Sequence, residues 1–197
     1  MSDLTSQSPR MSTPRNRPLP MRFSNQDAEQ EWSSPVVTQD GVKLFIRPAN
    51  PPDHDALKSF FEKVSRDDLY FRFLSGLRNV DEERLNHMLE DTDDRTIDFL
   101  AVALETGEIL ASAMLCADED FNNAEFAVVT REDKKGQGVS WALLDHAMRY
   151  AEAMGIETIS SLESAGQTHA LKLEREMGFT VRSCPDDATL MIAERTF

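Results

Sequence analysis

The stretch Lys135-Gly136-Gln137-Gly138-Val139-Ser140 separates an apolar, β-branched run from a segment with helical spacing. The run before it, 125–130, predicts a buried strand. The segment after it, 139–154, carries apolar residues three and four positions apart, which is typical of an amphipathic helix. Glycines between a strand and a helix N-terminus favour anion binding, because free backbone amides meet the positive end of the helix dipole there. The stretch therefore predicts a loop for a phosphate-bearing ligand.

The spacing of the two glycines differs from two well-known phosphate loops. The dinucleotide fingerprint G-x-G-x-x-G does not match, because position 141 is Trp. A P-loop would end in Gly-Lys followed by Ser or Thr, which this stretch lacks. On these residues alone, a tight turn without a ligand remains an equal alternative.

The loop resembles the Q/R-x-x-G-x-G/A motif of GNAT-type N-acyltransferases, which holds the pyrophosphate of acetyl-CoA. Lys135 stands at the Gln/Arg position, Gly138 at the fixed glycine and Ser140 at the final Gly/Ala position. Lysine keeps the positive charge but lacks the fork of a guanidinium group. The resemblance implies that acetyl-CoA contacts the strand end and the loop through Val128, Val129, Thr130, Lys135, Gly136, Gln137, Gly138, Val139 and Ser140.

The resemblance extends over roughly residues 41–197 and includes the order of the expected elements. Strands are expected at 41–49, 97–104, 109–115, 125–130, 156–161, 179–183 and 188–195, and helices at 53–64, 81–90, 139–154 and 167–177. It implies a GNAT fold of the α/β (α+β) class, with a mixed central sheet of six to seven strands flanked by about four helices. In that fold the strand at 125–130 parts from the strand at 156–161, which frees backbone groups for the pantetheine arm.

Two segments, 65–73 and 124–129, carry a narrower resemblance to the GNAT domain of bacterial protein lysine acetyltransferases. There, a glutamate in the same Ala-Glu-Phe-Ala context is the proposed general base, and the matching residue is Glu125. A carboxylate beside a half-buried strand can have a raised pKa and accept a proton from an ammonium group. An ion pair with a basic neighbour is the alternative interpretation of Glu125. The family transfers the acyl group directly, and a backbone N–H at Ala127 or Val128 is expected to bind the oxyanion.

The last expected helix departs from the family. The resemblance implies a tyrosine there as general acid, and this chain has Glu174 at that position. A glutamate donates a proton at neutral pH only if its pKa is strongly raised. The predicted function is an acetyl-CoA-dependent N-acetyltransferase that acts on a primary amine, either a small amine or a protein lysine. A non-catalytic acyl-CoA-binding regulatory module is the alternative.

Composition narrows the classes of partner. The chain has 35 acidic and 21 basic residues and a net charge of −14, which argues against nucleic acid and modestly favours a cationic acceptor. Because CoA is itself anionic, Arg131, Lys134 and Lys135 are expected to offset this charge locally. No apolar run approaches the ~20 residues of a membrane span, so no membrane partner is expected. Cys116 and Cys184 have no ligand partners at metal spacing, which predicts reduced thiols in a cytoplasmic protein and no metal. A homodimer is left open.

The first 35 residues differ in composition from the rest. They are rich in Ser, Pro, Gln and Asn, and they include four arginines between Arg10 and Arg22 without periodicity. Such a segment cannot bury enough apolar surface to order itself. We therefore predict a disordered tail over 1–35, followed by a GNAT domain over 36–197.

Overall fold

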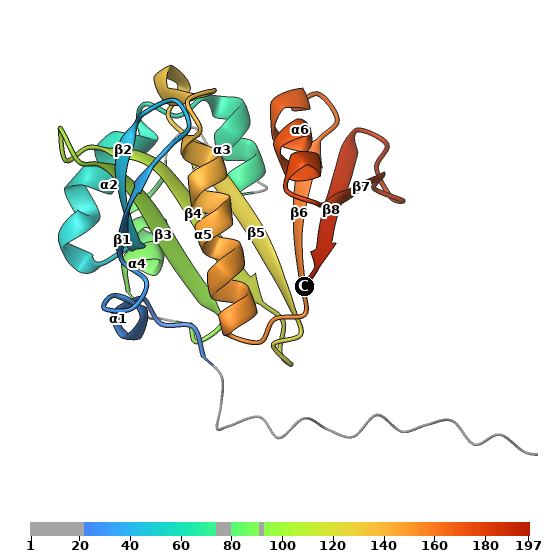
Figure 1. Ribbon diagram of the computed structural model, residues 1–197, viewed down its shortest axis with the longest axis horizontal. Coiled ribbons are helices and arrows are strands. Elements are labelled where there is room, and N and C mark those ends of the chain that lie inside the picture. The colour runs from blue at the N-terminus through green and yellow to red at the C-terminus, as the bar shows by residue number, and fades with distance from the viewer. Residues whose placement is uncertain (1–21, 74–79, 91–92) are drawn as a thin grey trace, which may run out of the picture.

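The computed structural model describes residues 22–73, 80–90 and 93–197. In them, eight strands form one mixed sheet in the order β1-β2-β3-β4-β5-β6-β8-β7 (Figure 1). The strands are β1 (Ser34–Val37), β2 (Lys43–Pro48), β3 (Thr96–Ala103), β4 (Ile109–Ala117), β5 (Asn123–Thr130), β6 (Thr158–Ser164), β7 (Thr180–Ser183) and β8 (Leu190–Thr196). The α-helices are α1 (Asn25–Ala28), α2 (His54–Phe61), α3 (Arg66–Phe73), α4 (Glu82–Leu89), α5 (Val139–Ala153) and α6 (Thr168–Glu176).

The expected class, α/β with a mixed central sheet, is confirmed. The described residues hold eight strands and six α-helices, so the expected counts of six to seven and about four were low. The additional strand is β1, and the additional helices are α1 and α3. All strand pairs are antiparallel except β5 with β6.

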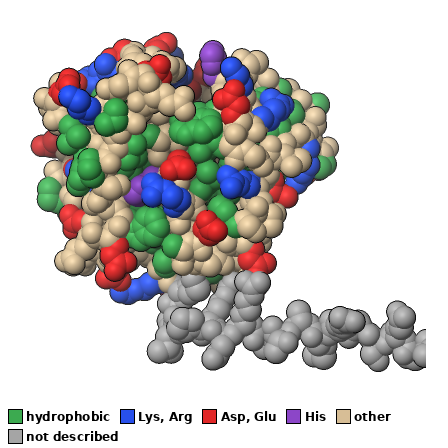
Figure 2. All heavy atoms as spheres, in the orientation of Figure 1, with side chains coloured by type: hydrophobic (Ala, Val, Ile, Leu, Met, Phe, Trp, Pro, Cys, Tyr) green, Lys and Arg blue, Asp and Glu red, His purple; other side chains and the backbone are tan. Residues whose placement is uncertain are grey.

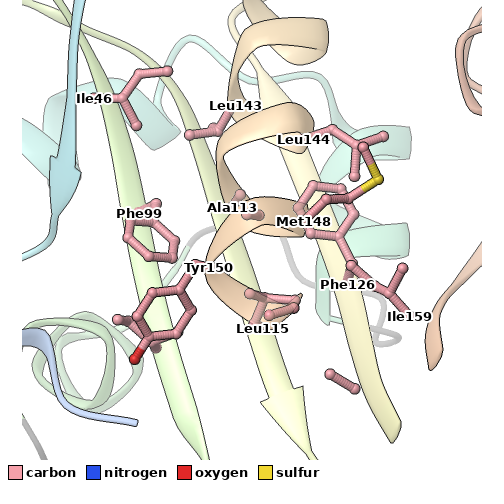
Figure 3. Packing of buried hydrophobic residues seen from close by; sticks show 14 of the residues in the cluster. Ile46, Phe99, Ala113, Leu115, Phe126, Leu143, Leu144, Met148, Tyr150 and Ile159 are labelled. Carbon is pink, nitrogen blue, oxygen red and sulfur yellow. The ribbon is translucent and has the colours of Figure 1, made fainter. Parts of the chain in front are cut away.

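Helix α5 covers one face of the sheet, and α2, α3 and α4 cover the other (Figure 1). On the α5 face, Leu143 and Leu144 pack over the middle strands, and Phe99 stacks edge-on against Tyr150 (Figure 3). Ala113 on β4 is fully buried and small, so it lets the helix approach the strand closely. Each large buried side chain contributes roughly 1.5–3 kcal/mol. This packing fixes the start of α5 beside the end of β5.

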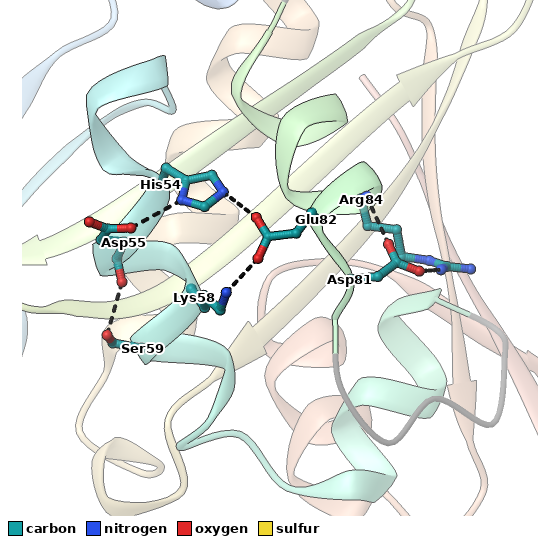
Figure 4. A network of polar contacts seen from close by, with 7 residues as sticks. All are labelled: His54, Asp55, Lys58, Ser59, Asp81, Glu82 and Arg84. Atoms are coloured by element: carbon teal, nitrogen blue, oxygen red, sulfur yellow. Dashed lines mark hydrogen bonds and ion pairs between the residues drawn. The ribbon is translucent and has the colours of Figure 1, made fainter.

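A network of polar contacts joins α2 to α4 on the opposite face (Figure 4). The carboxylate of Glu82 binds Lys58 and lies 2.7 Å from Nε2 of His54. Asp81 caps α4 by accepting a hydrogen bond from the amide of Arg84. These groups are largely exposed, so the network orients the helices but adds little stability.

Helix α3 is anchored by a buried ion pair to β3. Nη2 of Arg72 lies 2.7 Å from Oδ1 of Asp98, and the two side chains are 3% and 4% exposed. Burial raises the pKa of Asp98 to about 6, although Arg72 opposes this effect. The helix begins after Ser65, whose hydroxyl accepts a hydrogen bond from the amide of Asp68. Tyr70 lies on this helix, and residues 74–79 lie outside the described part of the chain.

The prediction of a disordered tail over 1–35 does not hold for residues 22–35, which belong to the folded domain. Phe23 is 1% exposed and packs against Phe121 and Tyr150 in the core under α5. The hydroxyl of Ser24 caps α1, and Trp32 packs edge-on against Tyr150. Residues 1–21 lie outside the described residues, so the prediction for them is untested.

Candidate acyl-CoA site

The sheet opens between β5 and β6. The two strands pair only from Asn123 with Thr158 to Glu125 with Ser160. Beyond that point β6 stays paired with β8 as far as Ser164, and β5 stays paired with β4 as far as Thr130. Figure 1 shows the two strands diverging towards the end where α5 begins. The backbone edge of β5 after Glu125 is therefore not used by β6, as the resemblance implied.

A cavity of about 930 Å³ occupies this opening, large enough for an extended ligand. Its walls come from β5, the glycine loop, the N-terminal half of α5, α6 and the β1–β2 hairpin. Of the nine residues expected to contact acetyl-CoA, seven line it: Val128, Val129, Thr130, Lys135, Gly136, Gly138 and Ser140. Gln137 and Val139 do not: Gln137 donates a hydrogen bond to the carbonyl of Asp133, and Val139 is buried in the core.

The glycine loop has the geometry of an anion site. Gly136 and Gly138 have φ values of 73° and 75°, in the left-handed region that favours glycine. Gly138 is the N-cap of α5 and has no side chain that could cap the helix. The first helical hydrogen bond runs from the amide of Ala142 to the carbonyl of Gly138, so the amides of the first turn lack helical acceptors. These free donors and the helix dipole fit a phosphate group.

Two contacts hold this loop in place. The hydroxyls of Ser140 and Thr130 lie 2.8 Å apart, which ties the first turn of α5 to the end of β5. A Cβ atom on Gly138 would lie 3.0 Å from Cβ of Thr38, on the β1–β2 hairpin. The hairpin therefore packs against the loop, and position 138 requires glycine both for its φ and for its space.

The positive charges near the loop are largely paired. Nζ of Lys135 lies 2.5 Å from Oδ2 of Asp68 on α3. Arg131 is bound by Asp133 at 2.8 Å and by Glu108 at 3.2 Å. We expected Arg131 to offset the negative charge near CoA. Its side chain is instead buried between two carboxylates, so its charge is already paired. Lys134 has no ion-pair partner within the described residues.

Glu125 lies at the point where the strands part, on the last paired position. Side chains alternate along β5, so Glu125 shares a face with Val129, which packs in the cluster under α2 and α4. Glu125 is exposed, whereas the sequence predicts a half-buried carboxylate. It lies outside the cavity lining and within electrostatic reach of Arg72. Its role as general base stays a prediction.

Comparison with known proteins decides the family, because the profile of the acetyltransferase (GNAT) family matches residues 59–179. The chain belongs to the GNAT acetyltransferase family. Acetyltransferase PA5475 of Pseudomonas aeruginosa is 26% identical over 157 residues, which cover 78% of this chain and 83% of that protein. GNAT enzymes use acetyl-CoA as the acyl donor and acylate amines.

Solved structures share the fold. The crystal structure of the GNAT domain of S. lividans PAT has a TM-score of 0.77 and 22% identity, covering 85% of this chain and 98% of that one. A GNAT-family acetyltransferase from Streptococcus pneumoniae has a TM-score of 0.63 and 20% identity, covering 78% and 99%. At these identities the two structures support the GNAT fold alone.

Two of the six acidic residues in the cavity wall of this GNAT domain are Glu163 on β6 and Glu174 on α6. Glu174 is 3% exposed and binds the hydroxyl of Ser161. Burial raises the pKa of Glu174 to about 7, against the opposing effects of Ser161 and Arg175. Burial also raises the pKa of Glu163 to about 8, with further contributions from Glu174 and Asp68. Sequence reasoning missed Glu163, although its place two residues after Ser161 puts both on one face of β6.

Several other residues that could take part in chemistry do not line the cavity, among them Tyr150, His146, Cys116 and Cys184. Tyr150 and His146 lie on the buried face of α5, and burial lowers the pKa of His146 to about 4. Cys116 and Cys184 are free thiols. Within the described ranges, no group of three or more His, Cys, Asp or Glu could hold a metal ion. None of the described helices is long and apolar enough to cross a membrane.

Proposed function

We propose that this GNAT protein transfers the acetyl group of acetyl-CoA to a primary amine, either a small amine or a protein lysine. The observation that carries the proposal is the opening of β5 from β6 directly beside the uncapped start of α5. A thioester arm can pair with the free edge of β5 while its pyrophosphate binds the loop amides. The residues present fit acetyl-CoA for this reason.

In the proposed reaction, a deprotonated amine attacks the thioester carbonyl carbon directly. Glu125, exposed at the point where the strands part, accepts the proton of the amine directly or through water. A backbone amide at Ala127 or Val128 stabilises the negative charge that develops on the carbonyl oxygen. The loop and β5 position the donor, so the amine approaches a fixed carbonyl group.

The acceptor is expected to be cationic before it reacts. The net charge of −14 favours amines over anionic acceptors. Acidic and basic side chains are nevertheless interspersed on the face shown in Figure 2, so attraction over a distance is weak there. The acceptor side of the opening is bordered by α3, where Tyr70 is 47% exposed.

A turnover assay tests the proposal. Release of free CoA thiol is measured with acetyl-CoA and a panel of lysine peptides, diamines and polyamines, and acetylation of the amine is confirmed by mass spectrometry. Glu125→Gln is expected to lower kcat by about 10²-fold or more while acetyl-CoA binding is kept. Glu157→Gln, an exposed glutamate near the start of β6, is the control with the same change of charge. Binding of acetyl-CoA without turnover for any amine would support the regulatory module instead.

A further inference from the structure

A second cavity, of about 500 Å³, adjoins the candidate acyl-CoA cavity beside α5. Three residues line both cavities: Trp141 and Asp145 on α5, and Glu176 on α6. Trp141 is the third residue of α5, so it lies about 4.5 Å along the helix axis from the N-cap Gly138. A ligand whose phosphates bind the glycine loop can therefore extend into this second cavity. We call it the Arg195 groove, because Arg195 on β8 lines it.

Arg195 brings a positive charge to the groove that no carboxylate neutralises. Its Nη1 atom donates a hydrogen bond of 2.6 Å to the carbonyl of Met177, and among the described residues no carboxylate forms an ion pair with it. The two acids of the groove are paired elsewhere, since Asp145 and Glu176 lie 3.1 and 3.6 Å from basic residues four positions away on their own helices. In a chain of net charge −14, an unpaired guanidinium group in a cavity wall favours an anionic ligand.

The guanidinium group of Arg195 is held in a fixed place. Nη1 lies 3.6 Å from Sδ of Met148, and Cζ lies 5.9 Å from the ring centre of Phe197. The group also lies against the backbone of Gly178, where an added Cβ atom would be 3.9–4.0 Å from Nη1, Cζ and Nε. Within the part of the chain that the structure describes, Nε and Nη2 have no hydrogen-bond partner. These two donors point the same way, which suits two oxygen atoms of one phosphate group.

Trp141 forms an aromatic wall between the glycine loop and Arg195. Its indole is partly buried, packs against the core under α5 and borders both cavities. Aromatic side chains of this kind stack on nucleobases with little regard to sequence. Loop amides, an aromatic ring and a guanidinium group are thus available to one ligand. Coenzyme A carries the matching groups: a pyrophosphate, an adenine base and a separate phosphate on the ribose 3′ oxygen.

We propose that the Arg195 groove binds the adenosine 3′-phosphate end of acetyl-CoA. Adenine stacks on Trp141, and Nε and Nη2 of Arg195 bind the 3′-phosphate. This inference rests on the proposed function, because it concerns the same acyl donor. Lys135 and Arg131 are already paired with carboxylates, so Arg195 supplies an attraction for the anionic donor that those two residues do not. The protein therefore distinguishes CoA thioesters from thioesters that lack the 3′-phosphate.

Isothermal titration calorimetry with CoA and with 3′-dephospho-CoA tests this assignment. The Kd of each ligand is measured for the wild type and for Arg195→Gln, which keeps a donor for the carbonyl of Met177 but has no charge. Arg182→Gln on β7, exposed and outside both cavities, is the control with the same change of charge. Trp141→Leu keeps an apolar side chain against the core but has no aromatic face. Circular dichroism verifies that each variant is folded.

The wild type is expected to bind CoA about tenfold or more tightly than 3′-dephospho-CoA at low salt. This preference should narrow as the ionic strength rises, because salt screens a partly exposed charge. In Arg195→Gln the preference should fall below about twofold, since only the affinity for CoA drops, whereas Arg182→Gln should keep it. Trp141→Leu should weaken the binding of both ligands about fivefold or more and leave their ratio unchanged.

The outcomes separate this assignment from the proposed function. No preference in the wild type, or the full preference in Arg195→Gln, overturns the assignment of the 3′-phosphate to Arg195 alone. Wild-type affinity of Trp141→Leu for both ligands overturns the placement of adenine. If the wild type binds neither ligand, the proposed function fails together with this assignment. If CoA binds with a preference that depends on Arg195 but no amine is acetylated, the proposed reaction fails and the groove assignment stands.

Discussion

Lys135 on the glycine loop and Asp68 on α3 form an ion pair, with Nζ 2.5 Å from Oδ2. The pair links the loop proposed to bind pyrophosphate to the helix that borders the acceptor side. Asp68 also contacts the hydroxyl of Ser65 at the start of α3, so its side chain is held in place. A bound phosphate would therefore compete with Asp68 for the ammonium group. This contact connects donor binding with the position of α3.

Asp68→Asn is expected to strengthen acetyl-CoA binding. The substitution frees Lys135 and removes one negative charge from the cavity wall. Partly exposed ion pairs contribute about 0.2–1 kcal/mol, so the Kd should fall by roughly 1.5–5-fold. Isothermal titration calorimetry at low salt measures the change, with Asp67→Asn, exposed on the same helix, as the control. Weaker binding by Asp68→Asn alone would show that the ion pair preorganises the loop instead.

Gly138→Ala is expected to destabilise the fold more than Gly136→Ala. Both positions have a positive φ, which costs an alanine about 1–2 kcal/mol. Only at 138 does the new Cβ meet another group, because it would lie 3.0 Å from Cβ of Thr38, whereas position 136 has open space. Urea unfolding measures both variants. Equal losses in the free energy of unfolding would mean that the β1–β2 hairpin moves away from the loop without an energetic cost.

The stability of the protein is expected to depend on pH through Glu174. Its pKa is about 7 in the folded state and near 4.5 when unfolded, so the folded state binds the proton more tightly. The resulting stabilisation is complete below pH 4.5 and is lost as the pH rises through about 7. It amounts to up to about 3 kcal/mol. Compared with wild type, Glu174→Gln should therefore show a smaller fall in the free energy of unfolding between pH 5 and about 8. If the free energy of unfolding changes with pH in the same way in the two proteins, the prediction is contradicted.

Asp98→Asn is expected to destabilise the protein strongly. It removes the partner of Arg72 and leaves a guanidinium group buried without a counter-charge. Breaking a buried pair in this way costs about 3–5 kcal/mol. Asp27→Asn removes the partner of exposed Arg22 and should change the free energy of unfolding by less than about 1 kcal/mol. Unfolding of the two variants in guanidinium chloride provides the comparison. Similar small losses in the free energy of unfolding would mean that α3 is held by apolar packing alone.

Much of the sheet and its main helices followed from local patterns. Helix α5 was predicted because its apolar residues keep helical spacing for 15 residues, and β3 and β4 because a turn separates two apolar runs. Strand β1 was missed because it is short and contains Pro35. At the edge of the sheet proline is tolerated, since among the described residues one side of that strand has no partner strand. Helix α3 was missed because charged residues mask its apolar side, and its anchor to Asp98 is distant in sequence.

The candidate site could likewise be predicted from the sequence only in part. The glycine loop was visible in the sequence, because its glycines, strand and helix are contiguous. The pairing of Lys135 with Asp68 was not, since the two residues are 67 positions apart. The convergence of Glu163 and Glu174 on one cavity was hidden for a similar reason, because one lies on a strand and the other on a helix.

Acetyl-CoA binding in the opening between β5 and β6 is tested most directly by isothermal titration calorimetry of the wild type and Gly138→Trp. The indole at position 138 would fill the space between the loop and Thr38 and displace the backbone amides from the phosphate. We expect micromolar binding by the wild type and no measurable binding by the variant, with circular dichroism showing that both are folded. No binding by the wild type, or equal affinity in the two proteins, would contradict the site described above.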